Sequence, residues 1–148
     1  MSILRRSVVM SGKEGENVLG RLKDAQQEFG YVPEEVMADL ARSCGLPVSE
    51  IYGMTTFYSF LSTRPLGTYV IRICKSIPCY LKDAEMIIEG VGREIGIAPG
   101  QTTSDKKFSL ELTNCIGACD MAPAMLVNDQ VYGHLTPGKI AEILKGFE

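Results

Sequence analysis

The chain changes its pattern of apolar residues at the segment STRPLG, residues 62–67. Before this segment, apolar residues recur at the spacing of amphipathic helices, and after it β-rich runs alternate with helical ones. Proline and glycine interrupt both kinds of regular structure, so the segment marks a boundary between two units. The sequence therefore predicts a helical unit over residues 1–65 and an α/β domain over residues 66–148.

Two amphipathic helices are expected at the start of the first unit. The first covers residues 16–29 and ends at Gly30, and the second has Pro33 at its first position and ends at Gly45. Glycine is the usual residue just past a helix end, and proline fits the first helical position. Each helix has one apolar face to bury, so the unit is predicted to be a small helical bundle.

A third helix is expected over residues 50–61, capped by Ser49. This helix is rich in aromatic residues, namely Phe57, Tyr58 and Phe60. An apolar stripe at helical spacing most often fills a core, so these side chains are expected mainly to pack inside the helical unit. A contact with a partner protein is the alternative for part of this surface, because aromatic residues are enriched at interface cores.

The second unit is expected to alternate strands and helices. The predicted elements are, in chain order, a strand, a helix, a strand, a hairpin and a helix, over residues 68–74, 81–96, 107–115, 124–133 and 136–147. The hairpin is expected to turn at Asn128-Asp129, and the last helix to begin after a Thr136 cap. This order of elements predicts an α/β fold of the thioredoxin type rather than a doubly wound sheet.

Four of the five cysteines form two close pairs at the ends of predicted strands. Cys74 and Cys79 are separated by four residues, and Cys115 and Cys119 by three. Neighbouring strands of one sheet would bring the two loops side by side. Four thiolates converging on one site are therefore geometrically plausible.

The cysteine pairs have several possible roles. A thioredoxin-type redox pair needs two intervening residues, which neither pair has. Structural disulfides are disfavoured by the odd number of cysteines and the absence of a recognisable secretory signal. Structural zinc commonly uses cysteine pairs at such spacings, and a [2Fe–2S] cluster also takes four thiolates, although the plant-type ferredoxin spacing is absent here. The small residues of CIGAC and the apolar MAPAM run favour the cluster, because they allow close backbone approach and shielding from water.

Composition excludes several classes of function. The formal net charge is −3 and neither half of the chain is basic, which argues against nucleic-acid binding. No segment approaches about 18 consecutive apolar residues, so no membrane insertion is expected. The N-terminal segment lacks the apolar run of a secretory signal, so a cytoplasmic location is expected. No general acid, base or nucleophile is recognisable, and no catalytic residue is predicted.

Three stretches of the sequence resemble a known protein family. They are FGYVPEEVMADLA, GMTTFYSFLSTRPLGTYVIRIC and CIGACDMAPAMLVND. They are similar to the thioredoxin-like [2Fe–2S] ferredoxin family, which includes the small [2Fe–2S] subunit of respiratory complex I, NADH:quinone oxidoreductase. Its counterparts occur in NAD(P)-linked, electron-bifurcating hydrogenases and in NAD-dependent formate dehydrogenases. The resemblance covers roughly residues 17–148.

This resemblance implies a ligand set, a function and partners. Cys74, Cys79, Cys115 and Cys119 would hold one [2Fe–2S] cluster. The chain would be a non-catalytic electron-transfer subunit that works beside a flavin/NAD(P)-binding subunit and further iron–sulfur subunits of an oxidoreductase complex. The alternative is a zinc-stabilised thioredoxin-like interaction module. One residue departs from the family, because members often carry a glycine where this chain has Asp83.

Overall fold

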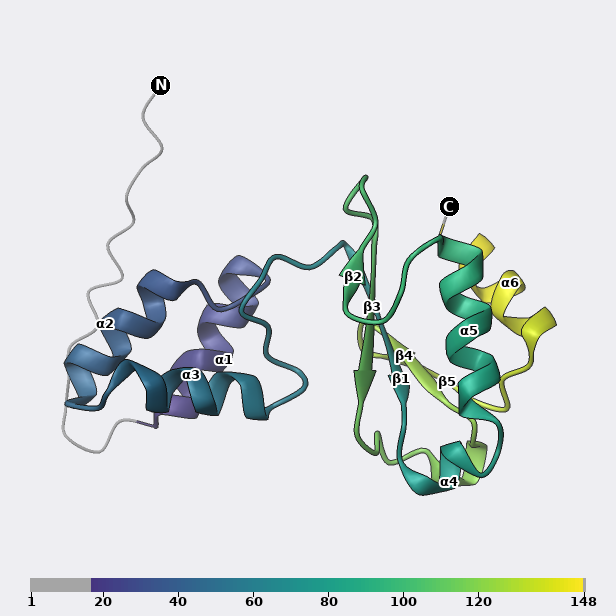
Figure 1. The fold of residues 1–148 in the computed structure, drawn as a ribbon, viewed down its shortest axis with the longest axis horizontal. Coiled ribbons are helices and arrows are strands. Elements are labelled where there is room, and N and C mark those ends of the chain that lie inside the picture. Colours follow the sequence, from purple (N-terminus) through teal and green to yellow (C-terminus); the bar gives the residue numbers. More distant parts are fainter. Residues whose placement is uncertain (1–16, 148) are drawn as a thin grey trace. The chain divides into compact units, whose positions relative to one another are not determined.

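The computed structural model describes residues 17–147, which divide into two compact units between Thr63 and Arg64 (Figure 1). This division lies near the boundary expected from the STRPLG segment. Each unit has a buried apolar core of its own. That the units fold as separate domains stays a prediction.

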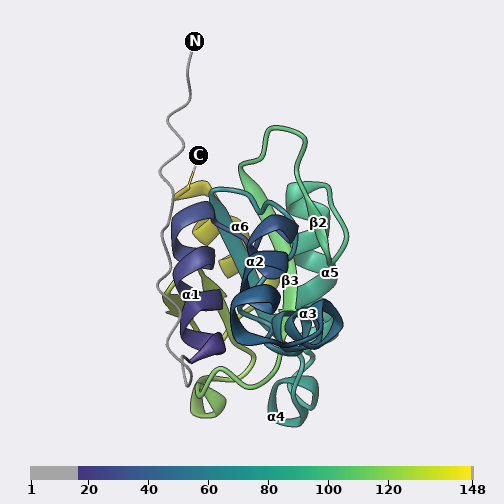
Figure 2. The ribbon, with the colours of Figure 1, turned by 90° about the vertical axis from the view of Figure 1, so that its left-hand side faces the viewer.

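Three helices form the first unit, with bounds α1 Val18–Phe29, α2 Glu34–Cys44 and α3 Val48–Phe57. In the view of Figure 2, α1 runs upright and α3 is seen along its axis, so α3 crosses α1. The predicted stops at Gly30 and Gly45 are confirmed, because each glycine donates its N–H to the last turn of its helix.

The core of this unit consists of apolar side chains from all three helices and the connection between α1 and α2. Its buried members are Leu22, Val32, Met37, Leu40, Ala41 and Ile51. The segment after α3 is tied back to the bundle by two hydrogen bonds. The Ser62 carbonyl accepts from the Val32 N–H at 2.7 Å, and the Ser62 N–H donates to the Gln26 Oε1 at 2.9 Å. The end of the first unit is therefore hydrogen-bonded to α1 and to the α1–α2 connection.

The prediction for the third helix was wrong in its bounds and in its packing. Helix α3 begins at Val48, directly after Pro47, and ends at Phe57. Its buried side is formed by Ile51 and Thr55, and the Thr55 hydroxyl donates to the Ile51 carbonyl at 2.8 Å. The aromatic side chains fall outside this buried side. Phe57 is 77% exposed, and Tyr58 and Phe60 are exposed as well.

The second unit is built on a five-stranded sheet. The strands are β1 Tyr69–Cys74, β2 Gln101–Thr102, β3 Phe108–Thr113, β4 Met125–Val127 and β5 Gln130–Tyr132. Their order in the sheet is β2-β3-β1-β4-β5. β1 and β3 run parallel, and the remaining neighbours run antiparallel. The fold confirms the predicted thioredoxin-like α/β class.

Two long helices cover one face of this sheet, as Figure 1 shows. They are α5 Ala84–Ile95 and α6 Pro137–Lys145. Alternate strand residues point toward them, and the buried core comprises Ile71, Ile73, Ile87, Val91, Phe108, Leu110, Met125, Val127, Leu135, Ile140 and Leu144. In this apolar layer, every second residue of the strands packs against side chains that recur every 3.6 residues on one face of each helix.

The hairpin and the last helix agree with the sequence, whereas three short elements were missed. Asn128 forms the turn between β4 and β5 with φ 53°, and the Thr136 side chain accepts from the Lys139 N–H. The missed elements are β2, the single-turn helix α4 Ile77–Tyr80 and the 3₁₀ turn η1 Cys119–Met121. Each is too short to show a periodic pattern.

No helix within residues 17–147 has both the length and the apolar character needed to cross a bilayer.

Gly67 lies where the chain passes close to β3. An added Cβ would come 2.9 Å from the Phe108 carbonyl carbon and 3.0 Å from backbone atoms of Lys107. Because this backbone cannot move without disturbing strand pairing, we expect Gly67→Ala to lower the free energy of unfolding by about 1–3 kcal/mol. Urea unfolding followed by circular dichroism measures the change.

The matched control is Gly138→Ala in the same unit. Its added Cβ meets no described atom within 4 Å. Because Gly138 lies in helix α6, where alanine is favoured over glycine, we expect this variant to be at least as stable as the parent chain, by up to about 1 kcal/mol. Equal unfolding midpoints for the two variants would contradict a tight approach at Gly67.

Candidate functional site

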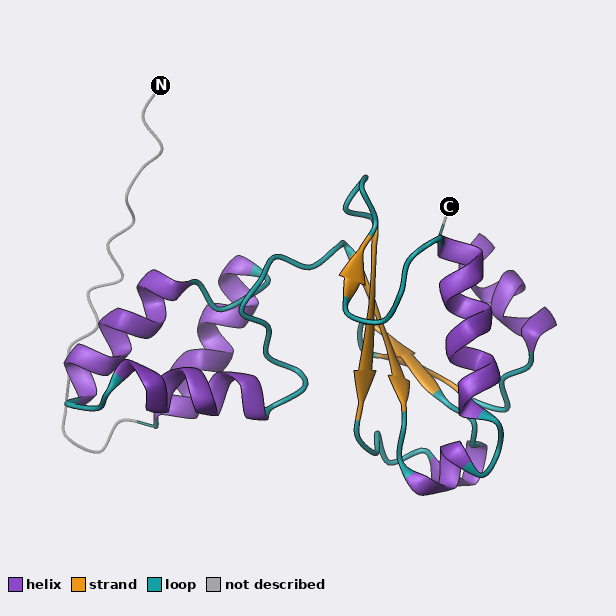
Figure 3. Cartoon of the chain, in the orientation of Figure 1, coloured by secondary structure: helices purple, strands orange, loops and turns teal. Residues whose placement is uncertain are grey.

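The parallel pairing of β1 with β3 brings the two cysteine loops to one edge of the sheet. Cys74, the last residue of β1, lies opposite Thr113, the last residue of β3. The pairing extends one step further, because the Lys75 N–H donates to the Thr113 carbonyl at 2.9 Å. Cys115 follows two residues later, so both loops leave the same end of the sheet (Figure 3).

The first cysteine pair is buried. Cys74 and Cys79 are each only 2% exposed. After Cys74 the chain forms the single turn α4, which begins after Ser76 and carries Cys79 back toward the strand end. The Cys79 thiol hydrogen-bonds to Cys74, and the Ala124 N–H donates to the Cys79 sulfur. The Ala124 carbonyl accepts from the Cys74 N–H at 3.3 Å, so one backbone residue holds both cysteines.

The second pair lies at the surface. The sulfurs of Cys115 and Cys119 are 3.3 Å apart, and both residues are exposed. Gly117, between them, has φ 81°, a left-handed conformation that side chains disfavour. This turn directs the Gly117 N–H toward the Cys115 sulfur at 3.4 Å. The small central residue of CIGAC therefore allows the backbone to donate to a cysteine sulfur.

The two pairs differ in acidity. Burial raises the pKa of Cys79 to about 11, and the hydrogen bond to Cys74 acts in the same direction. The Gly117 N–H lowers the pKa of Cys115, with help from the Cys119 thiol. The pKa of Cys119 is raised, first because its thiol donates to Cys115. Surface exposure and a backbone donor thus make Cys115 the thiol of this pair that ionises first.

The second loop is held against the rest of the unit by backbone hydrogen bonds. The His134 N–H donates to the Met121 carbonyl at 2.6 Å, and the Leu135 N–H donates to the Pro123 carbonyl at 3.1 Å. On its inner side, Ile116 packs with Ala122 against the buried cysteine pair. The sequence had indicated that apolar residues after Cys119 would keep one side of the site dry, and the buried small cluster agrees.

The backbone conformation at Asp83 explains how this residue can replace the glycine of the family pattern. It lies between α4 and α5 in a left-handed conformation, with φ 60° and ψ 40°. This region is the natural one for glycine, and aspartate is among the few other residues that enter it readily. The loop therefore keeps the backbone that a glycine would adopt, although the side chain differs.

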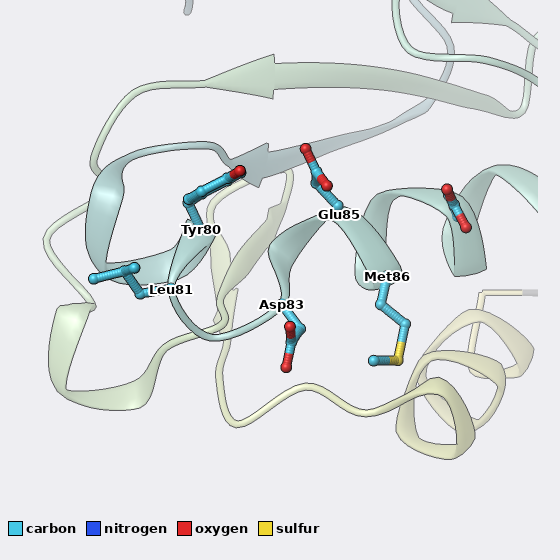
Figure 4. A pocket seen from close by; sticks show the side chains of 6 residues that line it. Tyr80, Leu81, Asp83, Glu85 and Met86 are labelled. Atoms are coloured by element: carbon cyan, nitrogen blue, oxygen red, sulfur yellow. The ribbon is translucent and has the colours of Figure 1, made fainter.

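An open hollow of about 460 Å³ lies beside α4 and the start of α5 (Figure 4). It is lined by Tyr80, Leu81, Asp83, Glu85, Met86 and Glu89. In Figure 4, Asp83 and Met86 point to one side of the helix start and Glu85 to the other. The lining contains none of the cysteines, so the hollow adjoins the cysteine site without contributing to it.

The donor set fits a centre with two metals. Two thiolates bound at about 2.3 Å to one tetrahedral metal lie roughly 3.7 Å apart. The 3.3 Å between the sulfurs of Cys115 and Cys119 is close to that separation. Cys119 also interacts electrostatically with Cys74 and Cys79, so the two pairs are neighbours. A [2Fe–2S] cluster takes four thiolates, two on each iron, which matches two adjacent pairs.

No group of three or more His, Cys, Asp or Glu side chains within residues 17–147 is arranged around a single metal ion. The four predicted ligands are therefore near one another as two pairs rather than as one tetrahedral set. Cys44, the fifth cysteine, is half-buried at the end of α2 in the helical unit and contacts the Ser43 hydroxyl. The structure does not bring it into the group.

Sequence reasoning missed the backbone donor of Ala124. Its N–H reaches the Cys79 sulfur, although Ala124 is 45 positions further along the chain than Cys79. A backbone contact of this kind leaves no side-chain signature. The sequence shows Gly117 only as a small residue, because its hydrogen bond to Cys115 depends on the conformation of the turn.

Comparisons with known proteins place this arrangement in context. The family model described as thioredoxin-like [2Fe-2S] ferredoxin matches residues 5–148. One subunit of the NADH-quinone oxidoreductase of Pseudomonas aeruginosa is 35% identical over 126 residues, which cover 85% of this chain and 76% of the relative. The HndA subunit of the NADP-reducing hydrogenase of Solidesulfovibrio fructosivorans is 36% identical over 132 residues, covering 89% and 77%.

A solved structure is also similar to this chain. The crystal structure of an NAD+-reducing [NiFe]-hydrogenase in its air-oxidised state contains a chain that matches with a TM-score of 0.68 and 25% identity. The match covers 86% of the present chain but only 22% of the hydrogenase chain. The present protein thus corresponds to a part of that longer chain.

The acidity difference between the pairs is testable by alkylation. In the full-length chain, stripped of iron and kept reduced, iodoacetamide should modify Cys115 first and Cys79 last, because only thiolates react. Cys79, with a pKa of about 11, should stay unmodified until the pH approaches that value. Cys115 should react at lower pH than an ordinary exposed thiol. Mass spectrometry of the peptides across a pH series measures both midpoints.

Denaturant supplies the control for this experiment. In the unfolded chain the two midpoints should coincide, since burial and the Gly117 N–H no longer act. Equal midpoints for Cys79 and Cys115 in the folded chain would contradict the buried environment of the first thiol and the exposed environment of the second.

Proposed function

The chain belongs to the thioredoxin-like [2Fe-2S] ferredoxin family, whose cofactor is a [2Fe–2S] cluster, and we propose that it carries one such cluster on Cys74, Cys79, Cys115 and Cys119. In this proposal it is an electron-transfer subunit of a multi-subunit NAD(P)-linked oxidoreductase. Its relatives are named as subunits of NADH-quinone oxidoreductase and of an NADP-reducing hydrogenase, and these names support the assignment.

One observation carries the ligand assignment. Two neighbouring cysteine pairs lie at the common edge of the parallel strands β1 and β3, and the sulfurs of the second pair are 3.3 Å apart. A single structural zinc ion would need the four sulfurs around one centre. Two neighbouring pairs, one of which has nearly the separation of two thiolates on one metal, support a two-iron centre instead.

When bound, a [2Fe–2S] cluster supplies a one-electron carrier whose potential depends on its surroundings. The chain contributes four thiolates, two backbone donors and partial exclusion of water. The N–H groups of Gly117 and Ala124 donate to the sulfurs of Cys115 and Cys79, which stabilises negative charge on them. Cys74 and Cys79 lie in a buried apolar cluster with Ala84. No acid, base or nucleophile is required of the chain.

The proposed partner is a flavin/NAD(P)-binding subunit, accompanied by further iron–sulfur subunits, in the cytoplasm. The complex is a bifurcating hydrogenase, a formate dehydrogenase or a form of complex I. The surface around the first cysteine loop supports a partner. Ile77 is 72% exposed and Leu81 is 73% exposed, with Tyr80 exposed between them. Exposed apolar side chains that are grouped together often mark interaction surfaces, whereas singly exposed ones are common on any protein.

Iron and sulfide content is the primary test of the cluster. The purified chain should contain two irons and two acid-labile sulfides, with visible absorbance and a paramagnetic signal on reduction. Cys119→Ser should remove most of this absorbance while the far-ultraviolet circular dichroism stays, because the sheet and its core do not include Cys119. Cys44→Ser is the matched control and should keep the full absorbance.

Other outcomes of this test favour the zinc module. One zinc with no sulfide would contradict the cluster. So would a colourless chain that unfolds when Cys119 is replaced, because a structural zinc site contributes directly to folding.

The proposed docking surface is testable separately from the cluster. Leu81→Asp places a charge on the exposed apolar surface without touching a cysteine. We expect it to weaken binding of the flavin subunit by about tenfold or more, as for loss of an interface anchor. Val131→Asp, at another exposed apolar position of the same unit, should bind like the parent chain. Titration calorimetry measures both affinities.

Two results would contradict this surface. One is an equal loss of affinity in both variants, and the other is an unchanged affinity for Leu81→Asp. Iron content is determined for each variant, so that a change in binding is not confused with loss of the cluster.

A further inference from the structure

The two cysteine pairs differ most in their accessibility to a reagent in solution. Cys74 and Cys79 are 2% exposed and form a buried cluster with Ala84. Cys115 and Cys119 are exposed, and their sulfurs are in contact at 3.3 Å. A sulfur–sulfur bond measures about 2.05 Å, so the exposed pair needs to close by little more than an ångström.

The segment that carries the exposed pair has room for this movement. It lies after β3, which ends at Thr113, and Cys119 lies in the short turn η1. Closing the sulfurs therefore requires no change in the pairing of β1 with β3. An added Cβ at Gly117, between the two cysteines, would meet no described atom within 4 Å. The middle of the loop is therefore not tightly packed at this position.

From this geometry we propose that Cys115 and Cys119, when they bind no metal, form a reversible disulfide that prevents the chain from taking up a cluster. The disulfide itself follows from the distance and exposure of the two thiols. Its effect on cluster uptake rests on the proposed function, in which both residues are ligands.

The oxidant is a small-molecule disulfide such as glutathione disulfide. The Cys115 thiolate attacks one sulfur of the reagent, forms a mixed disulfide and releases one reagent thiolate. The Cys119 thiolate then attacks the Cys115 sulfur, closes the internal bond and releases the second reagent thiolate. Two electrons pass from the cysteine pair to the reagent, and the two released thiolates take up the two cysteine protons. A dithiol reverses the reaction by the same exchange.

Trypsin separates the relevant cysteines and so allows a direct test. Cleavage after lysine and arginine places Cys74 in peptide 73–75, Cys79 in peptide 76–82, and Cys115 with Cys119 in peptide 108–139. The full-length chain is stripped of iron, incubated with glutathione disulfide, quenched with N-ethylmaleimide in denaturant so that buried thiols also react, and digested. We expect peptide 108–139 to lack maleimide and to be lighter by two hydrogens, while the other two peptides carry maleimide.

Cys119→Ser distinguishes ring closure from simple modification. Without the second thiol, Cys115 should retain glutathione as a stable mixed disulfide. Cys44→Ser, at a residue outside the group, should leave the masses of peptides 73–75, 76–82 and 108–139 as they are in the parent chain. Peptides linked between the buried and the exposed pairs, or maleimide on both Cys115 and Cys119 after oxidation, would overturn the proposal.

Cluster uptake is measured with ferric iron and sulfide under argon, on portions of the oxidised and reduced chains taken before N-ethylmaleimide is added. The oxidised chain should incorporate at least about tenfold less iron and sulfide than the reduced chain, because two of four ligands are blocked. Dithiothreitol should restore uptake. Equal uptake by oxidised and reduced chains would overturn the block. A reduced chain that takes up neither iron nor sulfide would instead overturn the proposed function, and the peptide map would still decide whether the disulfide forms.

Discussion

Six residues of β1 pair with six of β3 in the same direction, and both strands therefore end at one edge of the sheet. The convergence of the two cysteine loops follows from this pairing. Cys74 closes β1, and the loop that contains Cys115 and Cys119 begins where β3 ends. An antiparallel arrangement of the same two strands would have sent the loops to opposite edges. The 40 residues between Cys74 and Cys115, which include α5, are what a parallel connection across one face of the sheet requires.

The two loops position their cysteines in different ways. The first uses a single helical turn to return Cys79 to the strand end, and the Ala124 backbone serves both of its cysteines. The second uses a left-handed Gly117 to turn an N–H toward Cys115. Burial on one side and exposure on the other give the site an inner and an outer half. The inner half contributes shielding from water, and the outer half contributes access for a partner or for a reagent.

The sequence predicted the long elements, the thioredoxin-like class and the grouping of the cysteine loops at neighbouring strand ends. These features are encoded in periodic apolar patterns and in the cysteine spacing. The aromatic residues after Met54 were assigned wrongly to the core, because helical spacing alone does not say that Ile51 and Thr55 form the buried side. The turn α4 and the 3₁₀ turn at Cys119 are too short to have a period. The donor role of Ala124 arises from tertiary contact and has no local signature.

Asp83 has a consequence for how relatives of this protein are recognised. Its backbone takes the left-handed conformation that suits glycine, yet its side chain is a carboxylate. A search pattern that demands glycine at this position would reject the present chain, although the loop has the required shape. The constraint at this point is a pair of dihedral angles rather than a residue type. A pattern that accepts glycine, asparagine or aspartate here would follow the physics of the turn and would retrieve chains that a literal consensus discards.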